Sequence, residues 1–159
     1  MRGKSQKIVK FSAKQMQVLT WWSDGSQWRD LDAIICDGAV RSGKTLSCGI
    51  SFVSWAMRRY SGAQFALCGK TMASLRRNLL SYLLPMLLDL GFSCTEKISR
   101  NQVVISFGGR VNTFHIFGGK DEGSQALIQG STLAGVLFDE VALMPRSFVE
   151  QAIARCYWG

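Results

Sequence analysis

Hydrophobic and polar residues alternate along the chain with two periods, one typical of helices and one typical of strands. Behind Ser12, the residues Met16, Leu19 and Trp22 have helical spacing, and residues 46–60 and 74–90 continue this pattern. Short apolar or alternating runs predict strands at residues 33–37, 64–68, 93–98, 102–107, 111–117 and 133–138. Shorter helices are predicted at residues 124–128 and 146–156, the second of them opened by Pro145.

This order of elements predicts an α/β fold with a mainly parallel sheet flanked by helices. The exception is the stretch from residue 93 to 117, where hairpin-type turns at Arg100-Asn101 and Gly108-Gly109 join three strands. We therefore expect an antiparallel β insertion in the parallel pattern. Neither repeats nor linkers indicate a second domain, so residues 1–159 are expected to form one domain.

Composition narrows the class of protein. The 159 residues are 47% hydrophobic and 19% charged, which is typical of a globular domain, and the net charge of +8 favours nucleic acid or another acidic partner over mere solubility. The five cysteines are odd in number and lack Cys-x-x-Cys spacing, so we expect reduced core residues. Neither a signal peptide nor a run of about eighteen apolar residues is found, so no membrane association is expected.

The strongest motif follows the predicted strand at residues 33–37. It is Gly38-Ala39-Val40-Arg41-Ser42-Gly43-Lys44-Thr45, the spacing of a phosphate-binding loop, and a predicted helix comes directly after it. The two glycines allow backbone angles that let successive N–H groups wrap a polyphosphate. Lys44 supplies a charge for the β- and γ-phosphates, and the Thr45 hydroxyl is placed to bind Mg²⁺.

A pair of acidic residues, Asp139 and Glu140, ends the last predicted strand. Ligands of open α/β sheets gather at the carboxyl ends of the strands, where the phosphate-binding loop also lies. Asp139 is therefore expected to hold Mg²⁺, directly or through water, and Glu140 to polarise the water that attacks the γ-phosphate. Paired acids at this place favour an ATPase that does mechanical work over a small-molecule kinase.

Several other residues have two interpretations. Gln15 either completes a capping box with Ser12 or contacts adenine. Arg76 and Arg77 lie in the first turn of a predicted helix capped by Ser74, where the helix dipole disfavours cations, so a phosphate-binding role stays open. His115 is expected to be structural. Trp21, Trp22 and Trp28 could stack on nucleic-acid bases, but we expect them to pack in the core or to cover the loop. The basic tail at residues 1–10 is either a solvated end or a nucleic-acid arm.

The combination resembles the ATPase domain of the large terminase subunit of tailed phages, the motor that packages DNA into proheads. Three stretches carry this resemblance: residues 11–15 (Phe-Ser-Ala-Lys-Gln), the loop from Gly38 to Thr45, and residues 129–142, which run from Gln129-Gly130 to Asp139-Glu140-Val141-Ala142. The loop is generic to P-loop ATPases. Its combination with the last stretch is what is similar to a terminase.

The resemblance implies a RecA-like P-loop NTPase fold of the ASCE type, with ATP and Mg²⁺ bound. It implies that Gln15 contacts adenine and that Gly38, Ala39, Val40, Arg41, Ser42, Gly43, Lys44 and Thr45 bind the nucleotide. Lys44, Glu140 and Arg41 would be catalytic, with Arg41 sensing or contacting the γ-phosphate. Thr45 and Asp139 would be the metal ligands.

The same resemblance implies partners and a cellular place. These are double-stranded DNA, the portal protein, the small terminase subunit, neighbouring copies in a homo-oligomeric ring, and the cytoplasm of an infected bacterial host. Gln129-Gly130 stands where many relatives have Arg-Gly, so a trans-acting arginine is not expected there. The chain ends before the coupling motif, the remaining strands and the nuclease domain of the family. We therefore expect a truncated domain with weak ATP turnover and no nuclease activity. The alternatives are a helicase-like or repair ATPase and a catalytically silent nucleotide-binding fragment.

Overall fold

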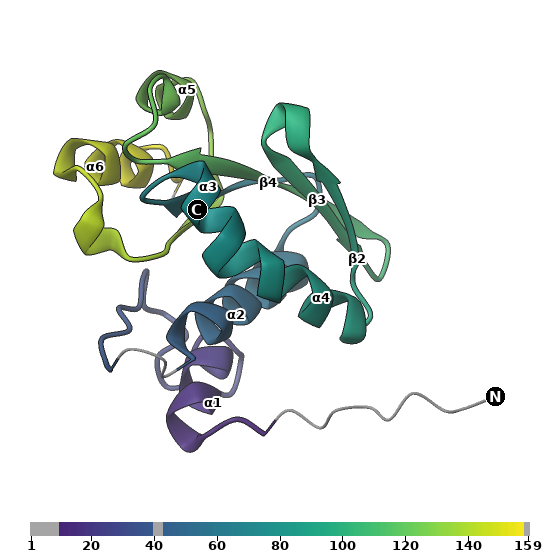
Figure 1. Cartoon of the computed structure of the whole chain (residues 1–159). Coiled ribbons are helices and arrows are strands. Elements are labelled where there is room, and N and C mark those ends of the chain that lie inside the picture. Colours follow the sequence, from purple (N-terminus) through teal and green to yellow (C-terminus); the bar gives the residue numbers. More distant parts are fainter. Residues whose placement is uncertain (1–9, 40–42, 158–159) are drawn as a thin grey trace.

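The structure is a computed structural model that describes residues 10–39 and 43–157 (Figure 1). Its described strands form one sheet in the order β2-β3-β4-β1-β5. The strands are β1 (Gln64–Gly69), β2 (Ser93–Lys97), β3 (Gln102–Phe107), β4 (Arg110–Gly118) and β5 (Gly135–Phe138). β1 runs parallel to both β4 and β5, whereas β2, β3 and β4 pair antiparallel. The α/β class and the antiparallel insertion are confirmed, and the sheet is mixed.

Helices cover both faces of this sheet. They are α1 (Ala13–Thr20), α2 (Lys44–Arg59), α3 (Met72–Leu75), α4 (Ser81–Asp89), α5 (Ser124–Gln129) and α6 (Arg146–Ala154). A π-helical turn, η1 (Arg76–Leu80), joins α3 to α4, and two 3₁₀ turns are η2 (Ile98–Arg100) and η3 (Val141–Leu143). In Figure 1, α2 and α4 lie on one side of the sheet and α5 and α6 on the other. None of the described helices is long and apolar enough to cross a bilayer.

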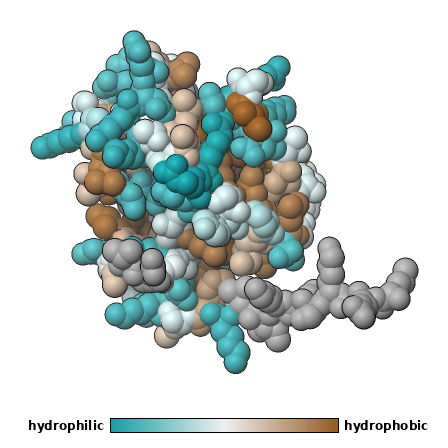
Figure 2. Space-filling view, in the orientation of Figure 1, coloured by the Kyte–Doolittle hydropathy of each residue, from teal (hydrophilic) through white to brown (hydrophobic). Residues whose placement is uncertain are grey.

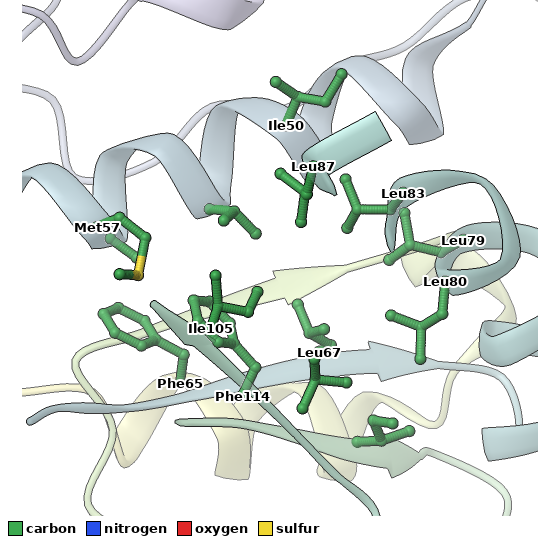
Figure 3. Close-up of a cluster of buried hydrophobic side chains, with 14 of the residues drawn as sticks. Ile50, Met57, Phe65, Leu67, Leu79, Leu80, Leu83, Leu87, Ile105 and Phe114 are labelled. Atoms are coloured by element: carbon green, nitrogen blue, oxygen red, sulfur yellow. The ribbon is translucent and has the colours of Figure 1, made fainter. Parts of the chain in front are cut away.

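The larger hydrophobic core lies between the sheet and the pair α2 and α4. Figure 3 shows its side chains meeting from the helices above and the strands below, among them Ile50, Met57, Leu83, Leu87, Phe65, Leu67 and Phe114. Gly49 allows the two helices to approach closely, since a Cβ there would lie 3.0 Å from Leu79 and 3.1 Å from Leu83. A second core under α5 and α6 contains Phe117, Ile128, Leu133 and Phe148. Because α2 is packed on this scaffold, its N-terminus is held in place.

The predicted strand at residues 33–37 does not form, and this expectation was wrong. Residues 33–37 have no regular secondary structure, and the Ile35 side chain is 90% exposed. A strand exists only beside another strand that satisfies its backbone N–H and C=O groups. Among the described residues β5 is the last strand of the sheet on that side, with β1 as its neighbour. The sequence of the segment is strand-like, but it lies without a pairing partner.

The helix predicted from residue 74 begins earlier. Thr71 is the N-cap of α3, its hydroxyl accepting from the Ser74 N–H at 3.0 Å, so Ser74 is the third residue of a capping box and not the cap. The helical path then continues through the π turn η1 into α4, which contains Pro85. Pro85 therefore does not begin a separate helix. The π turn η1 directly precedes α4, in which Pro85 removes a backbone hydrogen bond.

Candidate nucleotide-binding site

The loop and the acid pair meet at the carboxyl end of β5. Thr45, in the first turn of α2, donates its hydroxyl hydrogen to Oδ1 of Asp139 over 3.0 Å, although 94 residues separate the two in sequence. Asp139 follows β5 directly, and its backbone N–H donates to the Cys68 carbonyl at 2.8 Å. The strand ladder thus extends to Asp139 and aims its carboxylate at the start of α2. The sequence predicted this meeting.

The loop also folds around its own lysine. The Lys44 ammonium group donates to the carbonyl oxygens of Gly38 and of Ala39, the latter at 3.1 Å. Gly43 has a φ of +75°, a left-handed conformation that glycine adopts at little cost, and it stands at the N-cap of α2 without a capping side chain. The first N–H groups of this sixteen-residue helix therefore point toward the loop. Such a helix end attracts anions, phosphates in particular.

Gln15 takes part in the cap and also lies against the loop. Its Oε1 accepts from the Ser12 N–H at 2.8 Å, and its own N–H donates to the Ser12 hydroxyl at 3.2 Å, which confirms the capping box. Its Nε2 lies so close to Gly43 that a Cβ on that glycine would be 2.7 Å away. The two interpretations of Gln15 are therefore compatible. The cap uses the amide oxygen, while the amide nitrogen faces the loop.

The acid pair differs in conformation and in electrostatics. Glu140 has φ 56° and ψ 55°, a left-handed conformation that costs energy for a residue with a side chain and that is frequent at functional sites. Burial raises the pKa of Asp139 above its ordinary value, the Thr45 hydrogen bond lowers it, and the nearby charge of Glu140 raises it again. Because the charged form of Asp139 is disfavoured, a cation beside it would be stabilising.

The donor set suits a magnesium ion held partly by its substrate. No group of three or more His, Cys, Asp or Glu residues gathers anywhere in the described part of the chain. Mg²⁺ is commonly bound by one or two protein oxygens, with phosphate oxygens and water completing its shell. Thr45 and Asp139 provide such a pair. The predicted contacts of Val40, Arg41 and Ser42 lie outside the described residues.

Of the other residues that the sequence singled out, Arg76 and His115 make contacts that hold elements of the fold together. Arg76 lies 3.5 Å from Glu96 and donates to Asn101 at 2.9 Å, so it fastens α3 and η1 to the turn between β2 and β3. Arg77 is exposed. His115 lies between Gln64, which bonds its Nε2, and Gln102, whose amide nitrogen is 3.4 Å from its Nδ1. Burial lowers the pKa of His115, in agreement with a neutral, structural histidine.

The sequence did not indicate the thiol pair beside the site. All five cysteines are free, and Cys36 lies close enough to the Cys48 thiol on α2 to affect its pKa. Burial and the neighbouring Cys36 thiol raise the pKa of Cys48 to about 12, with further contributions from Asp139, which raises it, and Lys44, which lowers it. Apolar sequence neighbours suggested ordinary core cysteines. Their meeting depends on how residues 33–37 lie against α2, which no local pattern encodes.

Fold and site together define an α/β protein with the motif of a phosphate-binding loop, in which the start of α2 meets the acid pair that follows β5. A family model described as "Terminase large subunit, T4likevirus-type, N-terminal" matches residues 35–159. The chain therefore belongs to the terminase large subunit family. A search of curated proteins returned no match.

Solved structures agree with this assignment. The large terminase from a thermophilic bacteriophage, in crystal form 2, is 51% identical with a TM-score of 0.92, over 94% of this chain and 37% of that chain. The same terminase in complex with ADP is 49% identical with a TM-score of 0.89. Its complex with ATP-gamma-S is 47% identical with a TM-score of 0.87; both matches cover 94% of this chain and 36% of that chain.

A more distant likeness concerns the fold alone. The large terminase ATPase domain of Thermus phage P74-26 is 15% identical with a TM-score of 0.50, over 72% of this chain and 52% of that chain. The present chain spans little more than a third of the more similar terminase chains from the thermophilic bacteriophage, between 36% and 37% of their length.

Proposed function

We propose that this chain binds ATP with Mg²⁺ at the Lys44 loop and is the ATPase part of a motor that drives double-stranded DNA into a prohead. The observation that carries the proposal is the Thr45–Asp139 hydrogen bond of 3.0 Å, because it joins the loop to the acid pair. The terminase of the thermophilic bacteriophage, about half identical in sequence, has been solved with ADP and with ATP-gamma-S.

Each residue of the site has a distinct task in this proposal. Lys44 exchanges its loop carbonyls for the β- and γ-phosphates, and the N–H groups at the start of α2 receive phosphate oxygens. Thr45 and Asp139 hold Mg²⁺, which when bound neutralises charge on the phosphates. Glu140 orients and polarises the attacking water as a general base. Gln15 contacts the adenine edge, and Arg41 contacts the γ-phosphate.

The partners are proposed from family membership. They are double-stranded DNA, a portal protein, a small terminase subunit and further copies of the large subunit in a ring, all in the cytoplasm of an infected bacterium. Gln129 is the last residue of α5 and is exposed. It stands where the family resemblance implies an arginine in many relatives. If copies of this chain act on one another's nucleotide, another side chain must supply the positive charge.

Two substitutions test the site. Lys44→Ala should abolish binding of a fluorescent ATP analogue, because the charge facing the phosphates is lost, while the exposed Lys10→Ala serves as the matched control. Glu140→Gln should retain binding and lose phosphate release. Unchanged binding in Lys44→Ala would refute the loop assignment. Turnover that survives in Glu140→Gln would give the water-activating role to another residue.

The same assay separates a motor from a silent nucleotide-binding protein. A motor domain should release phosphate faster when double-stranded DNA and portal are present than with DNA alone. A helicase-like or repair ATPase should respond to free DNA without a portal. Binding without any phosphate release by the unchanged chain would favour the silent alternative.

A further inference from the structure

Three loops meet at the carboxyl end of β1, beside the nucleotide site. Backbone bonds link two of them, from the Gly119 N–H to the Gly69 carbonyl and from the Lys120 N–H to the Lys70 carbonyl, each at 2.9 Å. The turn between β2 and β3 joins the same edge, since the Ile116 N–H donates to the Asn101 carbonyl at 2.8 Å. Side chains from distant parts of the sequence therefore share this edge of the sheet.

These loops carry a group of exposed cations, which we call the basic edge: Lys70, Lys97, Arg100 and Lys120. None of the four forms an ion pair in the part of the chain that the structure describes. In the space-filling view, hydrophilic residues gather over α5, and hydrophilic and hydrophobic residues lie together around the turn between β2 and β3 (Figure 2). The positive charge is thus available to a partner in solution.

The acidic residues of the same region are mostly engaged. Glu96 lies 3.5 Å from Arg76, and Asp121 accepts from the Met72 N–H at 2.7 Å at the start of α3. Asp121 keeps its negative charge, since its partner is a neutral N–H, and Glu122 is exposed, so these two acids offset two of the four positive charges. The edge therefore has a net positive charge after the local pairs have formed.

The size and character of the edge fit a nucleic-acid backbone. Neighbouring strands lie about 4.8 Å apart, so the three spacings from β2 to β1 span about 15 Å. Duplex DNA carries one negative charge per about 1.7 Å of axis when both strands are counted, so a duplex of this length carries about nine phosphate charges, of which one face meets a part. A stable protein interface would need an apolar centre. Here the one large apolar side chain on the β2–β3 turn is Ile98, 68% exposed.

We propose that the basic edge binds the phosphate backbone of double-stranded DNA, without reading its sequence. This inference rests on the proposed function and names the DNA contact within it. The contact lies one strand away from the metal-binding acid, because β1 leads to Lys70 and its neighbour β5 leads to Asp139. A packaging motor must bind DNA of any sequence, and contacts to the phosphate backbone give binding that does not depend on sequence.

The test compares two triple variants with equal loss of charge. The edge variant is Lys97→Gln, Arg100→Gln, Lys120→Gln, and the control variant is Arg29→Gln, Arg58→Gln, Arg155→Gln, all of them exposed positions. Binding of a labelled duplex of random sequence is measured by fluorescence anisotropy between about 50 and 200 mM salt. Thermal melting and binding of a fluorescent ATP analogue are recorded for the same samples.

The edge variant should lower the slope of log affinity against log salt by about 2.7, or 0.9 per phosphate contact. Between the two salt concentrations this corresponds to an affinity ratio about 40-fold smaller than that of the unchanged chain. The control should change the slope by less than one contact. Equal losses in both variants, or no DNA binding by a folded unchanged chain, would overturn the inference. Failure of ATP binding with the edge effect intact would instead count against the proposed function alone.

Discussion

Gly135, the first residue of β5, lies directly under an indole ring of α2. A Cβ built on Gly135 would be 2.7 Å from Cζ3 of Trp55, 2.9 Å from its Cη2 and 3.3 Å from Cε2 of Phe52. Contacts below 3.0 Å require something to move. The substitution Gly135→Ala therefore forces α2 away from β5, or turns an indole that its neighbours hold.

The cost can be derived from that packing. The Trp55 ring has neighbours on several sides, with centroids of Phe52, Tyr60 and Phe65 at 5.7, 5.4 and 5.8 Å. Overpacking of this kind typically costs about 1–3 kcal/mol. In a chain of this length, 1 kcal/mol shifts the melting temperature by about 2–4 °C. We expect Gly135→Ala to melt about 2–12 °C lower than the unchanged chain, toward the upper end of this range because the neighbouring rings hold the indole in place.

Circular dichroism melts of five proteins test this expectation: the unchanged chain, Gly135→Ala, Gly25→Ala, Trp55→Phe and the double variant. Gly25→Ala is the matched control, since no heavy atom lies within 4 Å of its built Cβ, and it should stay within about 0.5 kcal/mol of the unchanged chain. Trp55→Phe removes both of the closest atoms, so Gly135→Ala should cost much less in that background, with a coupling of about 1–3 kcal/mol. A Gly135→Ala protein that melts with the control, or additive effects in the double variant, would refute the packing argument.

Three further predictions concern the site and its support. Asp139→Asn keeps an acceptor for Thr45 but removes a buried charge, and burial raises the pKa of the Asp139 carboxyl, so the nucleotide-free variant should melt at a higher temperature than the unchanged chain above about pH 7. This gain should vanish as the pH falls below the raised pKa, where the native carboxyl is protonated. Calorimetry should show that Mg²⁺-dependent ATP binding is lost at every pH. Gln15→Glu can still complete the cap with Ser12 but no longer donates from Nε2, so melting should change little while the preference for ATP over GTP declines in competition binding. Asn112→Ala, at a side chain 1% exposed, leaves a backbone N–H and a backbone C=O between α2 and β1 without partners and should cost about 2–5 kcal/mol in urea unfolding.

The sequence predicted those parts of the fold that depend on local pattern. Periodicity located α2, the five strands of the sheet and the capping box at Ser12, because each is set by residues close in sequence. The strand predicted at residues 33–37 failed for the opposite reason. A strand requires a neighbour, and whether one is present is a property of the assembled sheet. The N-cap of α3 was predicted at Ser74 and is Thr71, because both residues have hydroxyl groups that can cap a helix.

The sequence likewise predicted some features of the candidate site and not others. A phosphate-binding loop has a fixed spacing, and an acid pair at a strand end has a fixed place in parallel sheets, so the approach of Thr45 and Asp139 followed from the motifs. The left-handed backbone of Glu140 and the thiol pair of Cys36 and Cys48 did not follow. Both depend on where two segments come to rest against each other. Sequence spacing carries no information on that.

The geometry of α2 and β5 explains why the site depends on packing far from it. Ten residues of helix separate Thr45 from Trp55, a rise of about 15 Å at 1.5 Å per residue. Four residues of strand separate Gly135 from Asp139, about 13 Å at 3.3 Å per residue. The helix runs antiparallel along the strand and touches it at both ends, through the indole on Gly135 and the hydroxyl on Asp139. Because the two lengths nearly match, α2 cannot slide along β5 without loss of one contact. A change at the aromatic end that displaces α2 therefore reaches Thr45 as a movement of the whole helix.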